Sequence, residues 1–291
     1  MKRWSITLLA CLALAALTAC RDGGPHMAAG TDGAGPDAAR IESVAMAASQ
    51  QGNAEAEQRL RSWAARGMPV AQRELGILYR ARPGQQEEAM RLLEQAARSG
   101  DAQAAFHLAE AYRGIANGTH PAGARGAAGA ASTAPPAGAD GIRAASAAST
   151  AGASAPAAAI SNGSSPGALA WRWYLAAAEK KHAKAALMLG LLARNGEGVP
   201  RDAARSARWL EAASELGNAH AMFLLSYAYR EGQGVPRDAA RAQHWLEESA
   251  EHEYPPALQE LAMAVADSDA ERAGHLLKEA HEHRRNNWNR F

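Results

Sequence analysis

The sequence predicts an all-α fold: an α/α superhelical solenoid of about five to six helix pairs with a long disordered insertion. Of the 291 residues, 75 are Ala, the residue with the highest helix propensity, whereas aromatic residues make up only 5%. This composition argues against a β-sandwich. A second observation is that the segment Gly198–Arg205 recurs unchanged at Gly234–Arg241, 36 residues later. Repeats of this length are typical of solenoids, in which each unit packs only on its neighbours.

Residues 1–19 have the pattern of a signal peptide. Lys2 and Arg3 precede an apolar run, 6–17, that is shorter than the roughly 20 residues needed to span a bilayer. The run ends in Leu-Thr-Ala-Cys, which resembles a bacterial lipobox, so we expect Cys20 to be the lipid attachment site. Lipid on this residue would hold the protein in a membrane. The alternative is a plain signal peptide cut nearby, with Cys20 incidental.

The cysteine count and the charge balance exclude several functions. Cys11 lies in the signal peptide and Cys20 is the expected lipid site, so the folded part has no thiol for a disulfide, a Cys-zinc site or a nucleophile. Lys and Arg number 31 against 30 Asp and Glu, so no excess of positive charge indicates nucleic-acid binding. Residues 20–37, rich in Gly, Asp, Pro and Ala, are expected to be a flexible tether.

Each repeat is predicted to contain two helices, A and B. In one A helix the apolar residues follow the spacing i, i+3, i+4 and i+7 from Ala221 onward. Gly232 is placed to end that helix, and Asp238 to cap the B helix that follows. Trp209 and Trp245 lie at corresponding positions of two B helices, and we expect both to be largely buried.

The repeats fall into two blocks. In the first block, Leu75 and Tyr79 correspond to Leu108 and Tyr112 at an offset of 33 residues. A segment rich in Ala, Gly, Ser and Pro then separates the A helix at 102–113 from its B helix at 168–181. The expected boundaries are 38–113 for the N-terminal repeats, 114–167 for the disordered insertion, 168–283 for the C-terminal repeats and 284–291 for a tail.

The repeat resembles the Sel-one-like (Sel1-like) repeat, a branch of the tetratricopeptide superfamily. The matching features are the pair Leu189-Gly190, the Gly-x-Gly-Val-Pro-x-Asp loop, and a Trp seven residues beyond Asp202 and Asp238. The resemblance implies a protein–protein interaction scaffold or adaptor, here as a lipoprotein of the bacterial cell envelope. Its position would be the outer membrane, facing the periplasm, and its partner a protein or peptide bound on the concave face.

Candidate partner-binding residues lie on the A helices. Arg80, Arg113, Arg194 and Arg230 all close their A helices at the same repeat position. They could complement the helix dipole, or they could form a cationic ladder that binds an acidic peptide. Neighbouring positions on the same face vary between repeats, as expected of a binding groove. The predicted site residues are Phe106, Phe223, Tyr227, Arg113, Arg194 and Arg230.

We expect no enzymatic activity, no cofactor and no metal site. His281 and His283 are two residues apart on a predicted helix, so their side chains diverge. The alternative is a secreted hydrolase of the β-lactamase-like branch of the repeat family, whose members are rich in paired cysteines that this chain lacks. A third alternative is a soluble secreted effector. Acylation of Cys20 separates that effector from a lipoprotein.

Overall fold

The computed structural model describes residues 35–118 and 165–286. The chain divides into two compact units, Met1–Asp37 and Ala38–Phe291, and every described helix belongs to the second. The predicted signal peptide, Cys20 and most of the predicted tether lie outside the described residues, as do 119–164 of the predicted insertion and 287–291 of the predicted tail. None of the helices in the described ranges has both the length and the apolar character needed to cross a membrane.

The described part of the chain contains twelve α-helices and no β-strand, which confirms the predicted fold class. The helices before the gap are α1 (Ala38–Gln50), α2 (Ala54–Ala65), α3 (Pro69–Arg80), α4 (Gln86–Arg98) and α5 (Ala102–Ala116). Those after it are α7 (Pro166–Glu179), α8 (Ala183–Asn195), α9 (Ala203–Glu215), α10 (Ala219–Glu231), α11 (Ala239–Glu251), α12 (Pro255–Val265) and α13 (Ala270–Asn286).

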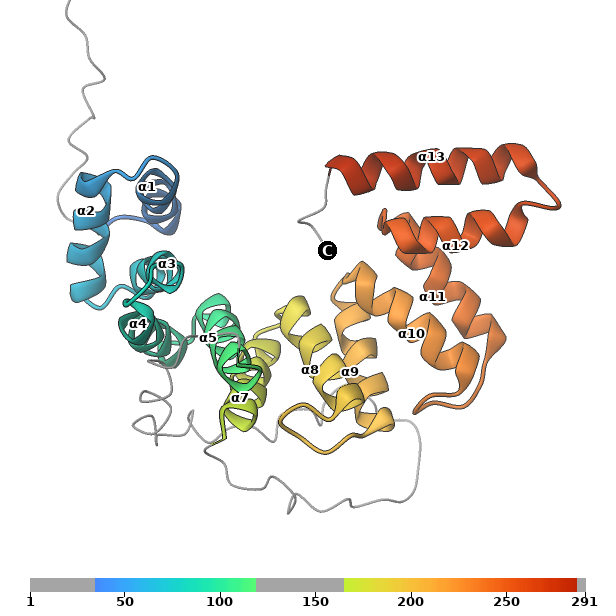
Figure 1. Cartoon of the computed structure of the whole chain (residues 1–291), viewed down its shortest axis with the longest axis horizontal. Helices are drawn as coiled ribbons and strands as arrows, with labels where there is room; N and C mark the ends of the chain where they lie inside the picture. The colour runs from blue at the N-terminus through green and yellow to red at the C-terminus, as the bar shows by residue number, and fades with distance from the viewer. Residues whose placement is uncertain (1–34, 119–164, 287–291) are drawn as a thin grey trace, which may run out of the picture. The chain divides into compact units, whose positions relative to one another are not determined.

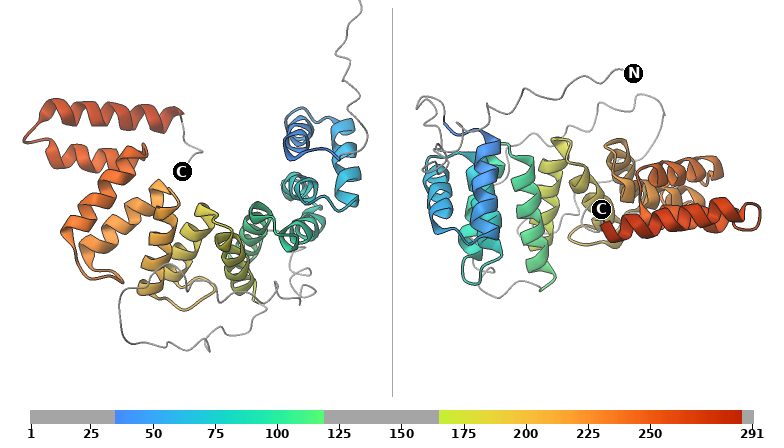
Figure 2. Two further views of the ribbon diagram at one scale, coloured as in Figure 1. Left: turned by 180° about the vertical axis from the view of Figure 1, so that it is seen from behind. Right: turned by 90° about the horizontal axis from the view of Figure 1, so that it is seen from above.

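Helices that follow one another along the chain pack together and form six A–B pairs (Figure 1). The pairs are α1–α2, α3–α4, α5–α7, α8–α9, α10–α11 and α12–α13, and each B helix also packs on the next A helix. α5 and α7 lie side by side although residues 119–164 separate them in the sequence, as Figure 2 also shows from two further sides. The predicted pairing of 102–113 with 168–181 is therefore confirmed.

Three of the predicted segment boundaries are wrong by a few residues. α5 continues to Ala116 instead of ending at Arg113, because Ile115 is buried in the largest hydrophobic cluster. α7 begins at Pro166, one residue after Ser165, whose hydroxyl accepts a hydrogen bond from the Ala168 amide at 3.3 Å. α13 continues to Asn286 instead of 283, and its last turn is basic, which favours the helix C-terminus.

The predicted helix caps are present. Asp202 caps α9, with its carboxylate accepting a hydrogen bond from the Arg205 amide at 2.9 Å. Gly196 ends α8 in the left-handed conformation at φ 78°, which a residue with a side chain rarely adopts. Asp238 and Gly232 have the same roles one repeat later. The repeated loop therefore has a defined function, which is to end an A helix and begin the next B helix.

Trp209 and Trp245, which were expected to be largely buried, pack against hydrophobic clusters of the core without being fully buried. Both are half-buried, whereas the residues that follow them, Leu210 and Leu246, are buried. A helix turns by about 100° per residue, so the residue after each Trp points to the centre of the interface and the Trp lies at its flank. Trp173 on α7, in contrast, is 3% exposed.

Candidate functional site

The predicted site residues lie on three A helices, α5, α8 and α10. Two of them, Phe223 and Tyr227, are part of an aromatic cluster between α10 and the start of α12. The Phe223 ring packs edge-on against Tyr227, with 5.0 Å between centroids, and lies 5.4 Å from the ring of Tyr254. His220 stacks on Tyr254 at 5.4 Å and 20°. We call these four half-buried residues the α10–α12 aromatic cluster.

A similar arrangement lies between α5 and α8. The Phe106 ring stacks on His182 at 4.7 Å and 20°, and packs edge-on against the buried Tyr174 at 5.7 Å. Phe106 and Phe223 occupy corresponding positions, and each contacts the N-cap residue of a following A helix, His182 or Tyr254. Sequence reasoning missed these two N-cap residues. Their spacing of 72 residues, twice the repeat length, could have identified them as equivalent.

Three of the four aligned arginines bond within the chain. The guanidinium of Arg230 pairs with Glu260 on α12 and lies 3.9 Å from the ring centroid of Tyr227. The guanidinium nitrogens of Arg113 lie 3.7 Å from a carboxylate oxygen of Glu110 and 3.8 Å from one of Glu197.

The remaining two arginines differ from each other. Arg80 donates a hydrogen bond of 3.1 Å to the backbone carbonyl of His107. Arg194 forms no ion pair within 35–118 and 165–286. The arginines thus tie repeats together at several junctions: Arg113 and Arg230 pair with carboxylates, Arg80 bonds a backbone carbonyl, and Arg194 does neither in the described part.

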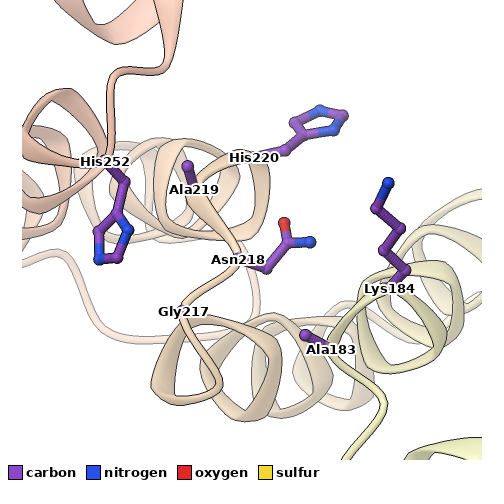
Figure 3. A pocket seen from close by; sticks show the side chains of 7 residues that line it. All are labelled: Ala183, Lys184, Gly217, Asn218, Ala219, His220 and His252. Carbon is purple, nitrogen blue, oxygen red and sulfur yellow. The ribbon is translucent and has the colours of Figure 1, made fainter. Parts of the chain in front are cut away.

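A cavity of about 230 Å³ opens where α8 and α10 begin (Figure 3). Its polar lining consists of Lys184 from α8, Asn218 and His220 from the start of α10, and His252 from the end of α11. The small residues 183, 217 and 219 complete the lining, and none of the lining residues is acidic. This cavity could not be predicted from the sequence, because its side chains come from three helices.

Within the two described ranges, no group of three His, Cys, Asp or Glu side chains is placed to hold a metal ion. His283 instead lies with its Nδ1 atom 3.5 Å from a carboxylate oxygen of Glu253.

His182 makes the junction between α5 and α8 sensitive to pH. Its Nδ1 atom caps α8 by accepting a hydrogen bond from the Ala185 amide at 3.2 Å, which requires the unprotonated ring. Burial lowers the pKa of His182 from 6.5, with Lys184 acting in the same direction and Asp101 opposing it. Burial, with the charge of Arg80, also lowers the pKa of His107 to about 4. Acid therefore favours the unfolded chain, whose histidines protonate more readily.

We expect the contribution of His182 to the free energy of unfolding to be constant above about pH 7 and to fall as the pH drops below 6.5. His182→Asn should remove part of this dependence, because Asn can cap the helix without titrating, as Asn218 does at the start of α10. Urea unfolding at pH 7.5 and pH 5.5 measures the effect. An equal pH dependence in the variant and the wild type would show that His182 does not contribute.

Comparison with known proteins agrees with this geometry. The family model "Sel1 repeat" matches residues 69–101, 167–182, 183–218 and 219–254. No curated protein matches the sequence. Among solved structures, the chain is similar to a protective antigen of uropathogenic Escherichia coli strains that displays an SLR fold, with 19% identity and a TM-score of 0.57 over 84% of this chain. The match covers 46% of that antigen, so the chain spans about half of its length.

A Sel1 repeat protein from Oxalobacter formigenes is similar at 24% identity and a TM-score of 0.57, over 83% of this chain and 84% of that one. At these identities the likeness concerns the fold. The structural likeness also extends over more of the chain than the four matched segments do. The four matched segments are thus similar to the Sel1 repeat, and the chain shares the fold of these solved structures.

Proposed function

We propose that this protein is a non-enzymatic protein-interaction scaffold that binds a peptide or protein on its A-helix face. The observation that supports this most strongly is the α10–α12 aromatic cluster with Arg230 beside it. Aromatic and Arg side chains that are partly exposed and already held in place supply most of the binding energy in protein interfaces. The Sel1 repeat fold itself suggests a scaffold.

The variation between equivalent positions supports the same proposal. Leu187 on α8 is 7% exposed and belongs to a hydrophobic core cluster, whereas Phe223, at the corresponding position of α10, is only half-buried. A residue needed only for packing would not have to be aromatic and partly exposed. A large ring at this position provides apolar surface to a partner while its other side packs on Tyr254.

Arg194→Glu tests this function with little disturbance of the fold. Arg194 has no ion pair within the described ranges, so the substitution should not change the melting temperature appreciably. Arg230 is unsuitable for this test, because a Glu there would face Glu260. The matched control is Arg208→Glu on the exposed side of the B helix α9.

If the A-helix face binds the partner, Arg194→Glu should weaken capture of envelope proteins by about fivefold or more, and Arg208→Glu should not. Quantitative affinity capture with chemical crosslinking measures both variants against the wild type. Capture of the same proteins in the same amounts by both folded variants would contradict the proposed binding of a partner on the A-helix face.

We also propose that lipid on Cys20 holds the scaffold in the outer membrane, facing the periplasm. The support is the sequence alone: the positive residues Lys2 and Arg3, the apolar run and the Leu-Thr-Ala-Cys motif. Cys20→Ser should abolish metabolic labelling with a fatty acid and release the protein from membranes. Labelling of the variant as strong as that of the wild type would contradict the anchor.

A further inference from the structure

The cavity at the start of α8 and α10 has the chemistry of an anion-binding site. All three of its ionisable lining side chains, Lys184, His220 and His252, are basic. Figure 3 shows Lys184 and His220 on the same side of the cavity as the side-chain amide of Asn218. The Asn218 oxygen accepts a hydrogen bond from the Ala221 amide at 2.9 Å, so its NH₂ group is left to donate.

The positive charge at this cavity is not neutralised by neighbouring side chains. Within the described part of the chain, neither Lys184 nor Arg194 forms an ion pair. Arg194 is close enough to act on His220, because its charge adds to burial in lowering the pKa of that ring. A neutral ring still donates one N–H group, so Lys184, Asn218 and His220 together offer hydrogen-bond donors to an acceptor with negative charge.

The size and the position of the cavity restrict the ligand. Its volume of about 230 Å³ is below the roughly 300–1,000 Å³ of pockets that enclose a small molecule, so it suits a single side chain or chain end. His220 belongs both to the cavity and to the α10–α12 aromatic cluster. A segment with an acidic residue beside an apolar one can therefore place its carboxylate in the cavity and its apolar side chain on Phe223.

We propose that this cavity binds a carboxylate from an acidic segment of the partner protein. The inference rests on the proposed function, because it names the chemistry of the partner that the A-helix face takes. Lys184 supplies the charge, Asn218 and His220 supply hydrogen bonds, and the aromatic cluster takes the neighbouring apolar side chain.

The test is a calorimetric titration of the full chain with N-acetylated hexaglutamate followed by a C-terminal Leu amide. We expect Lys184→Gln to raise the Kd about three- to fivefold, as for the loss of one exposed ion pair. Lys278→Gln on α13 is the matched control, since it removes the same charge from an exposed helix position outside the cavity. The control should bind like the wild type, and a hexaglutamine peptide should not bind.

Further probes distinguish other sources of anionic groups. An equal loss of affinity in both variants, or no loss in either, would overturn the proposal. So would Lys184-dependent binding of inorganic phosphate, or of phosphatidylglycerol vesicles, that is tighter than binding of the peptide. Because the titration needs no natural partner, its failure overturns the acidic-segment inference alone. Failure of the Arg194→Glu capture experiment instead overturns the scaffold proposal while the titration result stands.

Discussion

Gly234→Ala is expected to lower the free energy of unfolding by about 3 kcal/mol or more, from a single added methyl group. Gly234 has φ 76°, a conformation that costs an L-residue roughly 1–2 kcal/mol. A Cβ atom there would also lie 2.0 Å from the backbone oxygen of Ala203, at the start of α9. Backbone in a helix cannot move aside as a flexible side chain can, so adjacent repeats would have to separate.

Gly84→Ala is the matched control, because Gly84 has φ 81° but nothing lies within 4 Å of its added Cβ atom. Gly84→Ala should therefore lower the free energy of unfolding only by the cost of holding an L-residue at positive φ. Chemical unfolding of both variants measures the difference. Equal losses would mean that the α10–α11 loop does not contact the preceding B helix closely in solution. One repeat earlier, a Cβ atom added at Gly198 would lie 2.4 Å from the backbone of Gly167, so Gly198→Ala should behave like Gly234→Ala.

Arg73→Met is expected to destabilise the N-terminal repeats by about 3–5 kcal/mol. The side chain of Arg73 is only 9% exposed and lies at the centre of three carboxylates. It bonds Asp101 at 3.0 Å, Glu74 at 2.8 Å and Glu42 at 2.6 Å. Removing it leaves the carboxylate of Asp101, also 9% exposed, without its counter-ion, while the same carboxylate caps α5 through the Ala104 amide.

Two further variants separate this buried charge from simple loss of packing. Glu42→Gln should cost less than about 1 kcal/mol, because the Glu42 side chain is 53% exposed. Adding Asp101→Asn to Arg73→Met should recover part of the stability, since Asn can cap the helix without a charge. Thermal and urea unfolding measure all three. A double variant less stable than Arg73→Met alone would contradict a buried-charge mechanism.

The features that could be predicted from the sequence are those encoded by neighbouring residues. Asp202 and Gly232 act as caps because a cap depends on its own helix end, and the spacing of the loop places them there. The pairing of α5 with α7 was also predictable, since the repeat period identifies the two halves of a unit on either side of the gap. The rotation of α9 about its own axis could not be predicted. It places Leu210, and not Trp209, at the centre of the interface.

Features that depend on contacts between repeats could not be predicted. The sequence aligns Arg194 and Arg230 at one position, but only Arg230 meets a carboxylate on the next A helix, because Glu260 has no acidic counterpart one repeat earlier. From the sequence, a glycine in the loop between an A and a B helix is explained by local turn geometry alone. The structure adds that Gly234 must also lack a side chain because the preceding repeat lies against it.

The central claim, that the A-helix face binds the partner, is tested most directly by site-specific photocrosslinking in cells. A photoreactive phenylalanine replaces Tyr227 on the A helix α10 in one variant and Arg208 on the B helix α9 in the other. Both positions reach solvent, so reactivity alone does not favour either. We predict a discrete crosslinked protein from position 227 and none from position 208. Crosslinking only from position 208, or none from position 227 in a folded variant, would contradict this account.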